Sequence, residues 1–358
     1  MVHFDCKSLE IGDLKIPVPI IQGGMGVGIS LAGLAAAVTN AGGLGVISAA
    51  GIGMLGKSQS NGIDNVAAVR MEIRKARALT KGVLGINIMV ALSDFGQIVR
   101  AAVEEGIDVI FSGAGLPLNL PEMAGKDSRT KLIPIVSSAK AVKIIAKWWQ
   151  EKYNYIPDGF VVEGPLAGGH LGFKKDQLEQ AEFQLENLVP QVITAVQALE
   201  QTSNKKIPVI AAGGIFTGAD IKRFLDLGAS AVQMATRFVA TDECDADIAF
   251  KQAYVNCKQE DIGIIQSPVG MPGRAILNSY VNEVNKGNKQ PTQCPFHCIT
   301  TCKQDTSPYC ISLALINACK GRLNHGFAFI GAKGYLINEI VPVHQLFADL
   351  AREYAAAQ

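Results

Sequence analysis

The chain has 358 residues, of which 48% are hydrophobic and 18% charged, so it can bury a large core as one large domain with an appendage or as two domains. With 33 basic and 32 acidic side chains and no basic run, it lacks the signature of a protein that binds nucleic acid or an anionic membrane. No apolar run reaches the roughly 18 residues of a membrane span, and residues 1–12 lack the apolar core of a signal peptide, so we expect a cytoplasmic protein.

Short apolar runs that end in Gly, Ser or Asn alternate with segments whose apolar residues are spaced by three and four, which indicates strands alternating with helices. The expected strands cover residues 20–21, 44–47, 83–88, 108–111, 132–136, 160–162, 207–211 and 231–234. The expected helices cover residues 65–79, 95–105, 139–151, 188–199 and 219–227. Because parallel strands need crossover connections, this alternation predicts an α/β fold of the TIM (β/α)8 barrel type. An open doubly wound sheet is the alternative, but the early G-x-G-x-x-G motif with its later acidic residue is missing.

The regular alternation of strands and helices ends after residue 240. Helices are expected over residues 244–258 and 312–320, with interrupted or polar segments between them. We therefore expect a barrel at residues 1–240, a smaller, mostly helical, cysteine-containing lid domain at 241–325, and a C-terminal segment at 326–358. Within that last segment, residues 343–354 have the pattern of an amphipathic helix that packs back on the barrel.

Residues with chemical potential follow the expected strands, where the loops of a TIM barrel build the active site. Glycines at several of these strand ends would let the backbone approach a flat or phosphorylated ligand closely. The candidate ligand-binding residues at these ends are Gln22, Gly23, Gly24, Met25, Asn87, Glu163, Gly168, Gly169, Gly213, Gly214, Gln233, Ala235 and Thr236. The seventh and eighth loops are the usual phosphate site, and Gly213-Gly214 before a helix that begins near Gly218 fits it. The alternative is that the glycines only permit tight turns.

Two side chains near the expected barrel mouth carry charge or titrate. His170 lies in a glycine loop after the sixth strand, where it could act as a proton acceptor, or could merely cap a turn or bind the ligand. Arg274 ends a turn rich in Pro and Gly at residues 267–274, which either offers the guanidinium to an anionic substrate or is a plain connector.

Five of the eight cysteines lie between Cys294 and Cys319, and four of them, Cys294, Cys298, Cys302 and Cys310, have the spacing C-x3-C-x3-C-x7-C. In a cytosolic enzyme such a group favours free thiols or a metal over disulfides. On a helix, residues 294, 298 and 302 would share one face and could hold Zn or an Fe–S cluster, although the spacing matches no standard motif. The alternative is a set of reduced, partly buried thiols in a helical lid.

Several tracts together resemble one family over nearly the whole chain. They are residues 19–25 (P-I-I-Q-G-G-M), 85–87 (G-I-N), 163–170 (E-G-P-L-A-G-G-H), 210–215 (I-A-A-G-G-I) and 233–238 (Q-M-A-T-R-F). The chain resembles the nitronate monooxygenases, formerly 2-nitropropane dioxygenases, and the related FMN-dependent enoyl-acyl-carrier-protein reductases and NAD(P)H:quinone reductases. The resemblance implies a TIM barrel with an inserted helical domain and noncovalently bound FMN.

The resemblance also implies roles for individual residues. Gly24 and Met25 would lie against the isoalloxazine, and Asn87 and Glu163 would contact the ring or the ribityl chain. The ribityl chain and phosphate would be held by Gly168, Gly169, Gly213, Gly214, Gln233, Ala235 and Thr236. His170 matches the histidine that takes the α-proton of a neutral nitroalkane in nitronate monooxygenases. The chain departs from the family pattern at residues 164–166, which are Gly-Pro-Leu, and at Ala235, where many relatives have Gly.

Three functions remain open at this point. The first is a nitronate monooxygenase that uses O2, and the second is an NAD(P)H-dependent flavin reductase acting on an enoyl thioester or a quinone. The third is a flavin- and metal-binding protein without turnover. All three imply FMN and a small-molecule ligand rather than nucleic acid or membrane as the partner, and a homodimer is compatible with each.

Overall fold

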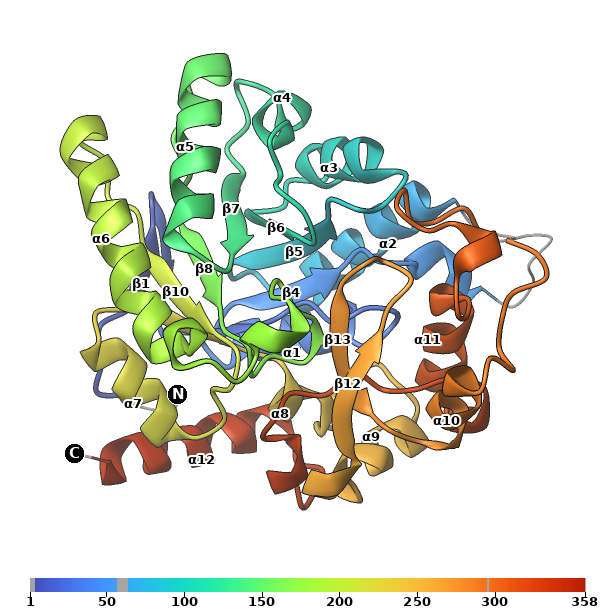
Figure 1. Ribbon diagram of the computed structural model, residues 1–358. Coiled ribbons are helices and arrows are strands. Elements are labelled where there is room, and N and C mark those ends of the chain that lie inside the picture. Colours follow the sequence, from blue (N-terminus) through green and yellow to red (C-terminus); the bar gives the residue numbers. More distant parts are fainter. Residues whose placement is uncertain (1–3, 57–63, 295, 358) are drawn as a thin grey trace.

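The computed structural model describes residues 4–56, 64–294 and 296–357. Its main sheet consists of β3 (Ile20–Gln22), β4 (Gly45–Ser48), β5 (Leu84–Met89), β6 (Val109–Gly113), β7 (Lys131–Val136), β8 (Phe160–Glu163), β10 (Val209–Ala212) and β11 (Ala231–Met234). The strands are hydrogen-bonded in the order β3-β11-β10-β8-β7-β6-β5-β4, and each paired neighbour is parallel. A parallel bridge between Ile21 and Leu44 joins the first strand to the last and closes the sheet (Figure 1). This confirms the predicted (β/α)8 barrel.

The barrel helices follow the strands as the apolar spacing predicts. They are α1 (Ala32–Asn40), α2 (Asn65–Leu79), α3 (Phe95–Glu104), α4 (Leu120–Ala124), α5 (Ala139–Tyr153), α6 (Leu185–Ser203), α7 (Gly218–Asp226) and α8 (Thr236–Val239). In α2 the residues Val69, Ile73 and Ala76, spaced by three or four, face the barrel and are buried. The side chain of Ser138 caps α5 by accepting a hydrogen bond from the Ala141 N–H, which satisfies a donor that the helix start leaves unpaired.

Two layers of apolar side chains hold the barrel together. One lies between the strands and the outer helices, and the other fills the barrel interior. The hairpin formed by β1 (Leu9–Ile11) and β2 (Leu14–Ile16) contributes Leu9, Ile11 and Ile16 to the interior layer. The hairpin thereby covers the end of the barrel opposite the carboxyl ends of the strands.

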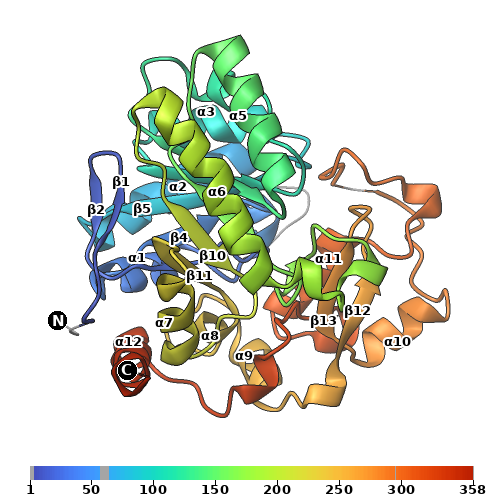
Figure 2. The same cartoon turned by 60° about the vertical axis from the view of Figure 1, so that its left-hand side comes forward.

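A smaller group of elements covers part of the open end (Figure 2). It comprises α9 (Ile248–Val255), β12 (Ile262–Gln266), β13 (Pro272–Ile276), α10 (Ser279–Asn285) and α11 (Ile311–Cys319). The sequence analysis expected helices here, and the structure adds an antiparallel sheet in which β13 pairs with β12 on one side and with β9 (Gly169–His170) on the other. Short 3-10 helices complete the chain at Ile52–Leu55, Lys175–Gln177, Ala181–Phe183, Gln259–Asp261, Gln304–Thr306, Leu323–His325 and Gly334–Leu336.

The C-terminal helix α12 (Val343–Ala356) packs against α7 and α1 at the outside of the barrel, with Leu346, Phe347 and Leu350 buried. None of the helices described here has both the length and the apolar character that a membrane crossing would need. The division of the chain at residues 240 and 325 stays a prediction.

Candidate functional site

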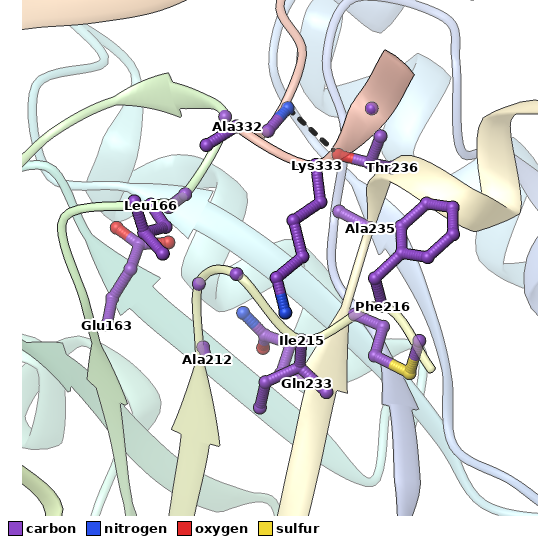
Figure 3. Close-up of a pocket in the computed structure, with 17 residues that line it drawn as sticks. Glu163, Leu166, Ala212, Ile215, Phe216, Gln233, Ala235, Thr236, Ala332 and Lys333 are labelled. Atoms are coloured by element: carbon purple, nitrogen blue, oxygen red, sulfur yellow. Dashed lines mark hydrogen bonds between the residues drawn. The ribbon is translucent and has the colours of Figure 1, made fainter. Parts of the chain in front are cut away.

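Two adjoining cavities open at the carboxyl ends of the strands. The larger one, of about 230 Å³, lies between the first loop of the barrel, at residues 23–27, and the smaller group of elements. The smaller one, of about 60 Å³, lies between the loops after β10 and β11 and the segment 331–334 (Figure 3). Both cavities are lined by Glu163, Gly168, Gln233, Ala235 and Thr236. Because they share these walls, the two cavities form one trough across the mouth of the barrel.

The structure brings nearly all of the sequence-predicted residues to this trough. In addition to the five shared residues, the larger cavity is lined by Gly23, Gly24, Met25, Asn87, Gly169 and His170, and the smaller one by Gly213 and Gly214. Gln22 is the exception, because its side chain is fully buried and lines neither cavity. Its amide accepts a hydrogen bond from the Val46 N–H at 3.0 Å and donates to the Gly23 carbonyl, so it fastens β3 to β4.

The smaller cavity has the features of an anion site. Gly213 and Gly214 both have positive φ angles, of 91° and 85°, and a Cβ atom at residue 213 would lie 2.7 Å from the Gly164 carbonyl oxygen. In the described parts of the chain, the backbone N–H groups of Gly214, Ala235 and Thr236 donate to no protein acceptor. Unpaired N–H groups around one concavity favour a phosphate or a carboxylate.

A lysine that the sequence analysis did not single out also lines the smaller cavity. Lys333 extends into it (Figure 3), and its Nζ lies 2.8 Å and 2.9 Å from the two carboxylate oxygens of Asp220. The Gly331 N–H donates to the Thr236 hydroxyl at 3.0 Å, which ties this segment to the eighth loop. The segment reads Gly-Ala-Lys-Gly at residues 331–334, and that glycine tract was the available sequence signal.

The start of α7 does not supply the anion donors that the sequence analysis expected near Gly218. The N–H groups of Phe216 and Thr217 donate to the Asp220 carboxylate, and that of Gly218 donates to Glu353 at 2.7 Å. These amides are already paired within the protein, so the loops after β10 and β11 provide the free donors instead.

His170 is positioned by pairing of the smaller sheet. It lies in β9 opposite Gly273, and the next residue, Leu171, donates its N–H to the Pro272 carbonyl at 2.8 Å. The Nε2 atom lies 2.7 Å from the Ser267 hydroxyl oxygen, and the ring packs edge-on against Phe329 at a centroid distance of 5.0 Å. Burial lowers the pKa of His170 to about 4, because the charged imidazolium loses its solvation there. The ring is therefore neutral at neutral pH and has a lone pair to accept a proton.

Glu163 stands at the carboxyl end of β8 and lines both cavities. Burial raises the pKa of its carboxyl group to about 7, and no neighbouring charge or hydrogen bond among the described residues offsets this rise. Burial thus favours the neutral form of both Glu163 and His170, as expected for groups in a poorly solvated trough.

The guanidinium of Arg274 is bound within the protein, so the structure favours the connector over the hypothesis that Arg274 binds an anionic substrate. Its Nη1 donates to the carbonyl oxygens of Pro165 at 2.5 Å and Ala167 at 2.7 Å, and the residue is buried. Burial lowers the pKa of the guanidinium. The side chain therefore fixes the loop that carries Gly168 and Gly169.

Residues 296–302 are not helical, so the single helix face on which Cys294, Cys298 and Cys302 would lie does not form. The Ser93 N–H donates to the Cys298 carbonyl at 3.1 Å, and the Thr300 N–H donates to the Ala91 carbonyl at 2.9 Å, so the segment is held in an open form by the loop after β5. All of the cysteines are free thiols, and among the described residues no three His, Cys, Asp or Glu side chains converge on a point where one metal ion could bind.

Other lining residues were missed from sequence. Ser48 follows the second expected strand but has no distinctive chemistry, and Tyr254, in α9, and Phe329 also line the larger cavity. Ser267, the partner of His170, is 97 residues away in the chain. Only the tertiary structure places these side chains together.

A closed (β/α)8 barrel with a trough at the carboxyl ends of its strands has the architecture of a TIM-barrel enzyme. Over residues 7–353 the sequence matches the nitronate monooxygenase family, and the chain belongs to that family of oxidoreductases. It is 30% identical, over 77% of its length and 68% of the relative, to the (3aS,4S,5R,7aS)-5-hydroxy-7a-methyl-1-oxo-octahydro-1H-indene-4-carboxyl-CoA dehydrogenase of Mycobacterium tuberculosis. It is 29% identical to a probable nitronate monooxygenase of Staphylococcus aureus, over 76% of this chain and 79% of the relative.

Solved structures agree with this family. FabK from Thermotoga maritima superposes with a TM-score of 0.73 at 28% identity, and the match covers 95% of this chain and 94% of that one. A nitroalkane oxidase from Streptomyces ansochromogenes also has a TM-score of 0.73, over 96% and 97% of the two chains. At 23% identity, this second likeness supports the fold alone.

Proposed function

We propose that the trough binds FMN, with the phosphate in the smaller cavity and the isoalloxazine in the larger one. The unpaired N–H groups of Gly214, Ala235 and Thr236 suit a phosphate, and Lys333 lines the same cavity as a further donor whose charge is balanced by Asp220. Gly168 allows the backbone at residues 330–331 to pack closely against this wall, because a Cβ atom there would come 2.5 Å from the Ile330 carbonyl carbon. The family membership supports the same assignment.

We further propose that the enzyme is a nitronate monooxygenase in which His170 is the general base. The observation that carries this proposal is the position of His170 at the wall of the larger cavity, where its Nε2 atom lies 2.7 Å from the hydroxyl oxygen of the buried Ser267. When the Nε2–H donates to Ser267 Oγ, Nδ1 keeps the lone pair that can remove the proton α to a nitro group. FMN would supply the electron-transfer chemistry, with O2 as the final acceptor.

A second candidate is a reductase or dehydrogenase that acts on a thioester. Two similar proteins favour it, because one is named as a dehydrogenase of a carboxyl-CoA compound and the other is FabK, at 28–30% identity. In this case the electrons would come from or go to NAD(P)H, and His170 would bind or protonate the substrate.

Anaerobic mixing distinguishes the two candidates. The purified holoprotein is mixed separately with a preformed alkyl nitronate, with NADH and with NADPH, and the flavin absorbance is followed. Bleaching by nitronate alone supports the monooxygenase. Bleaching only by a nicotinamide cofactor transfers the assignment to the reductase, and no bleaching by any donor contradicts both.

A further inference from the structure

A third cavity, separate from the trough, is lined by four cysteines. It has a volume of about 230 Å³ and is walled by Cys294, Cys298, Cys302 and Cys310 together with apolar groups that include Ile299 and Ile311. The segment that carries three of these cysteines lies beside α11, at the right-hand side of Figure 1. The proposed oxidoreductase chemistry leaves these thiols without a role.

The four thiols surround a space rather than a point. Because no three potential ligands in the described part converge on one ion, a single Zn2+ does not fit this arrangement. A [4Fe–4S] cluster needs a different arrangement, in which four thiolates each bind a separate iron at the corners of a wider body. A cavity with four cysteines on its wall offers the four thiolates that such a cluster needs.

The cavity also offers groups that stabilise thiolates. Cys298 Sγ lies 2.9 Å from the Ser312 hydroxyl, which can donate to a thiolate. Cys310 is the N-cap residue of α11 and makes no side-chain cap hydrogen bond, so its thiolate would lie at the start of the helix, where the helix dipole favours negative charge. Hydrogen bonds to cluster sulfurs of this kind are common in Fe–S proteins.

We propose that Cys294, Cys298, Cys302 and Cys310 bind a [4Fe–4S] cluster. On binding a [4Fe–4S]2+ core, four thiols lose their protons to solvent and four Fe–S bonds form, without electron transfer. The core itself contains two Fe2+, two Fe3+ and four sulfide ions, so those components suffice to assemble it. The helix α11 also contributes Leu315 to the wall of the larger cavity of the trough, and it therefore connects the two sites.

The test is anaerobic reconstitution of the purified holoprotein with equal amounts of Fe2+ and Fe3+ and with sodium sulfide. After desalting, iron, acid-labile sulfide and zinc are measured per chain, and a dithionite-reduced sample is examined by electron paramagnetic resonance. We expect about four irons and about four sulfides per chain and the signal of a reduced cluster.

Two variants and a matched control accompany the wild type. The Cys298→Ser/Cys310→Ser variant and the Cys294→Ala/Cys302→Ala variant should each retain less than about a tenth of the wild-type iron and sulfide. The second variant leaves Cys298, with its contact to Ser312, and Cys310 in place, so it tests the proposal even if the first variant fails to fold. The Cys6→Ser/Cys257→Ser control changes two thiols outside this cavity and should load like the wild type.

The proposal is overturned if the wild type retains neither iron nor sulfide, if it retains about one zinc and no sulfide, or if its cysteines form disulfides instead. It is also overturned if a well-folded Cys294→Ala/Cys302→Ala variant retains the full cluster content.

Discussion

Replacing Glu163 by glutamine should change the pH dependence of stability in protein without bound flavin. Burial raises the pKa of the Glu163 carboxyl from its usual 4.5 to about 7, so the folded chain holds a proton that the unfolded chain releases between these pH values. The stabilisation from the neutral carboxyl is therefore complete below about pH 4.5 and is lost as the pH rises through about 7. At about 1.4 kcal/mol per pKa unit, the loss amounts to roughly 3 kcal/mol by about pH 8.

The Glu163→Gln substitution keeps the size of the side chain but removes its ability to ionise, so the variant should escape this loss. We expect the free energies of unfolding of the variant and the wild type to agree near pH 4, and the variant to be more stable by about 3 kcal/mol at about pH 8. Urea denaturation at a series of pH values, followed by circular dichroism, measures this difference.

His170 titrates in the opposite direction over part of the same range. Its pKa is lowered from 6.5 to about 4, so its contribution to stability is present above pH 6.5 and is lost as the pH falls through 4. Both proteins contain His170, so this contribution cancels in the comparison. A difference between the variant and the wild type that stays constant from pH 4 to 8 would refute the burial argument for Glu163.

Three further predictions concern the trough. The cofactor released from the purified protein should have the mass of FMN, because the smaller cavity has room for one anionic group, and recovery of FAD would contradict this. Gly213→Ala should weaken FMN binding at least about tenfold, because the positive φ angle and the Gly164 carbonyl both oppose a Cβ atom. The control Gly287→Ala has a similar φ angle but open space around it, so it should leave the FMN affinity unchanged. A fluorescence titration with FMN measures both affinities. Ser267→Ala should lower kcat on a neutral nitroalkane about ten- to a hundredfold and alter the pH profile of kcat, because His170 loses the hydroxyl that orients its ring. An equal loss of kcat on preformed nitronate would show that Ser267 has a merely structural role.

The barrel could be predicted from the sequence because its signals are local. Each buried parallel strand is a short apolar run that ends in Gly, Ser or Asn, and each helix has apolar residues spaced by three and four. The glycines and polar residues at the strand ends then line the mouth by topology alone, which explains why the candidate residues other than Gln22 and Arg274 lie at the trough.

The features that the sequence could not predict depend on pairing between segments that lie far apart in the chain. The hairpin of β12 and β13 contains Gly263 and begins its second strand at Pro272, so it reads locally as a loop. Its pairing with β9 brings together residues about a hundred positions apart, and that pairing decides where His170 and Arg274 lie. The open form of residues 296–302 likewise depends on hydrogen bonds to Ala91 and Ser93 rather than on helical spacing.

The proposed role of His170 is tested most directly by comparing His170→Asn with the wild type on two forms of one substrate. Steady-state rates with O2 are measured on a neutral nitroalkane and on the same compound as preformed nitronate, at equal FMN content. We expect the variant to lose about 10² to 10⁴ in rate on the neutral form and far less on the nitronate, which has already lost its α-proton. Equal losses on both forms, or an unchanged rate on the neutral form, would contradict the assignment of His170 as the base.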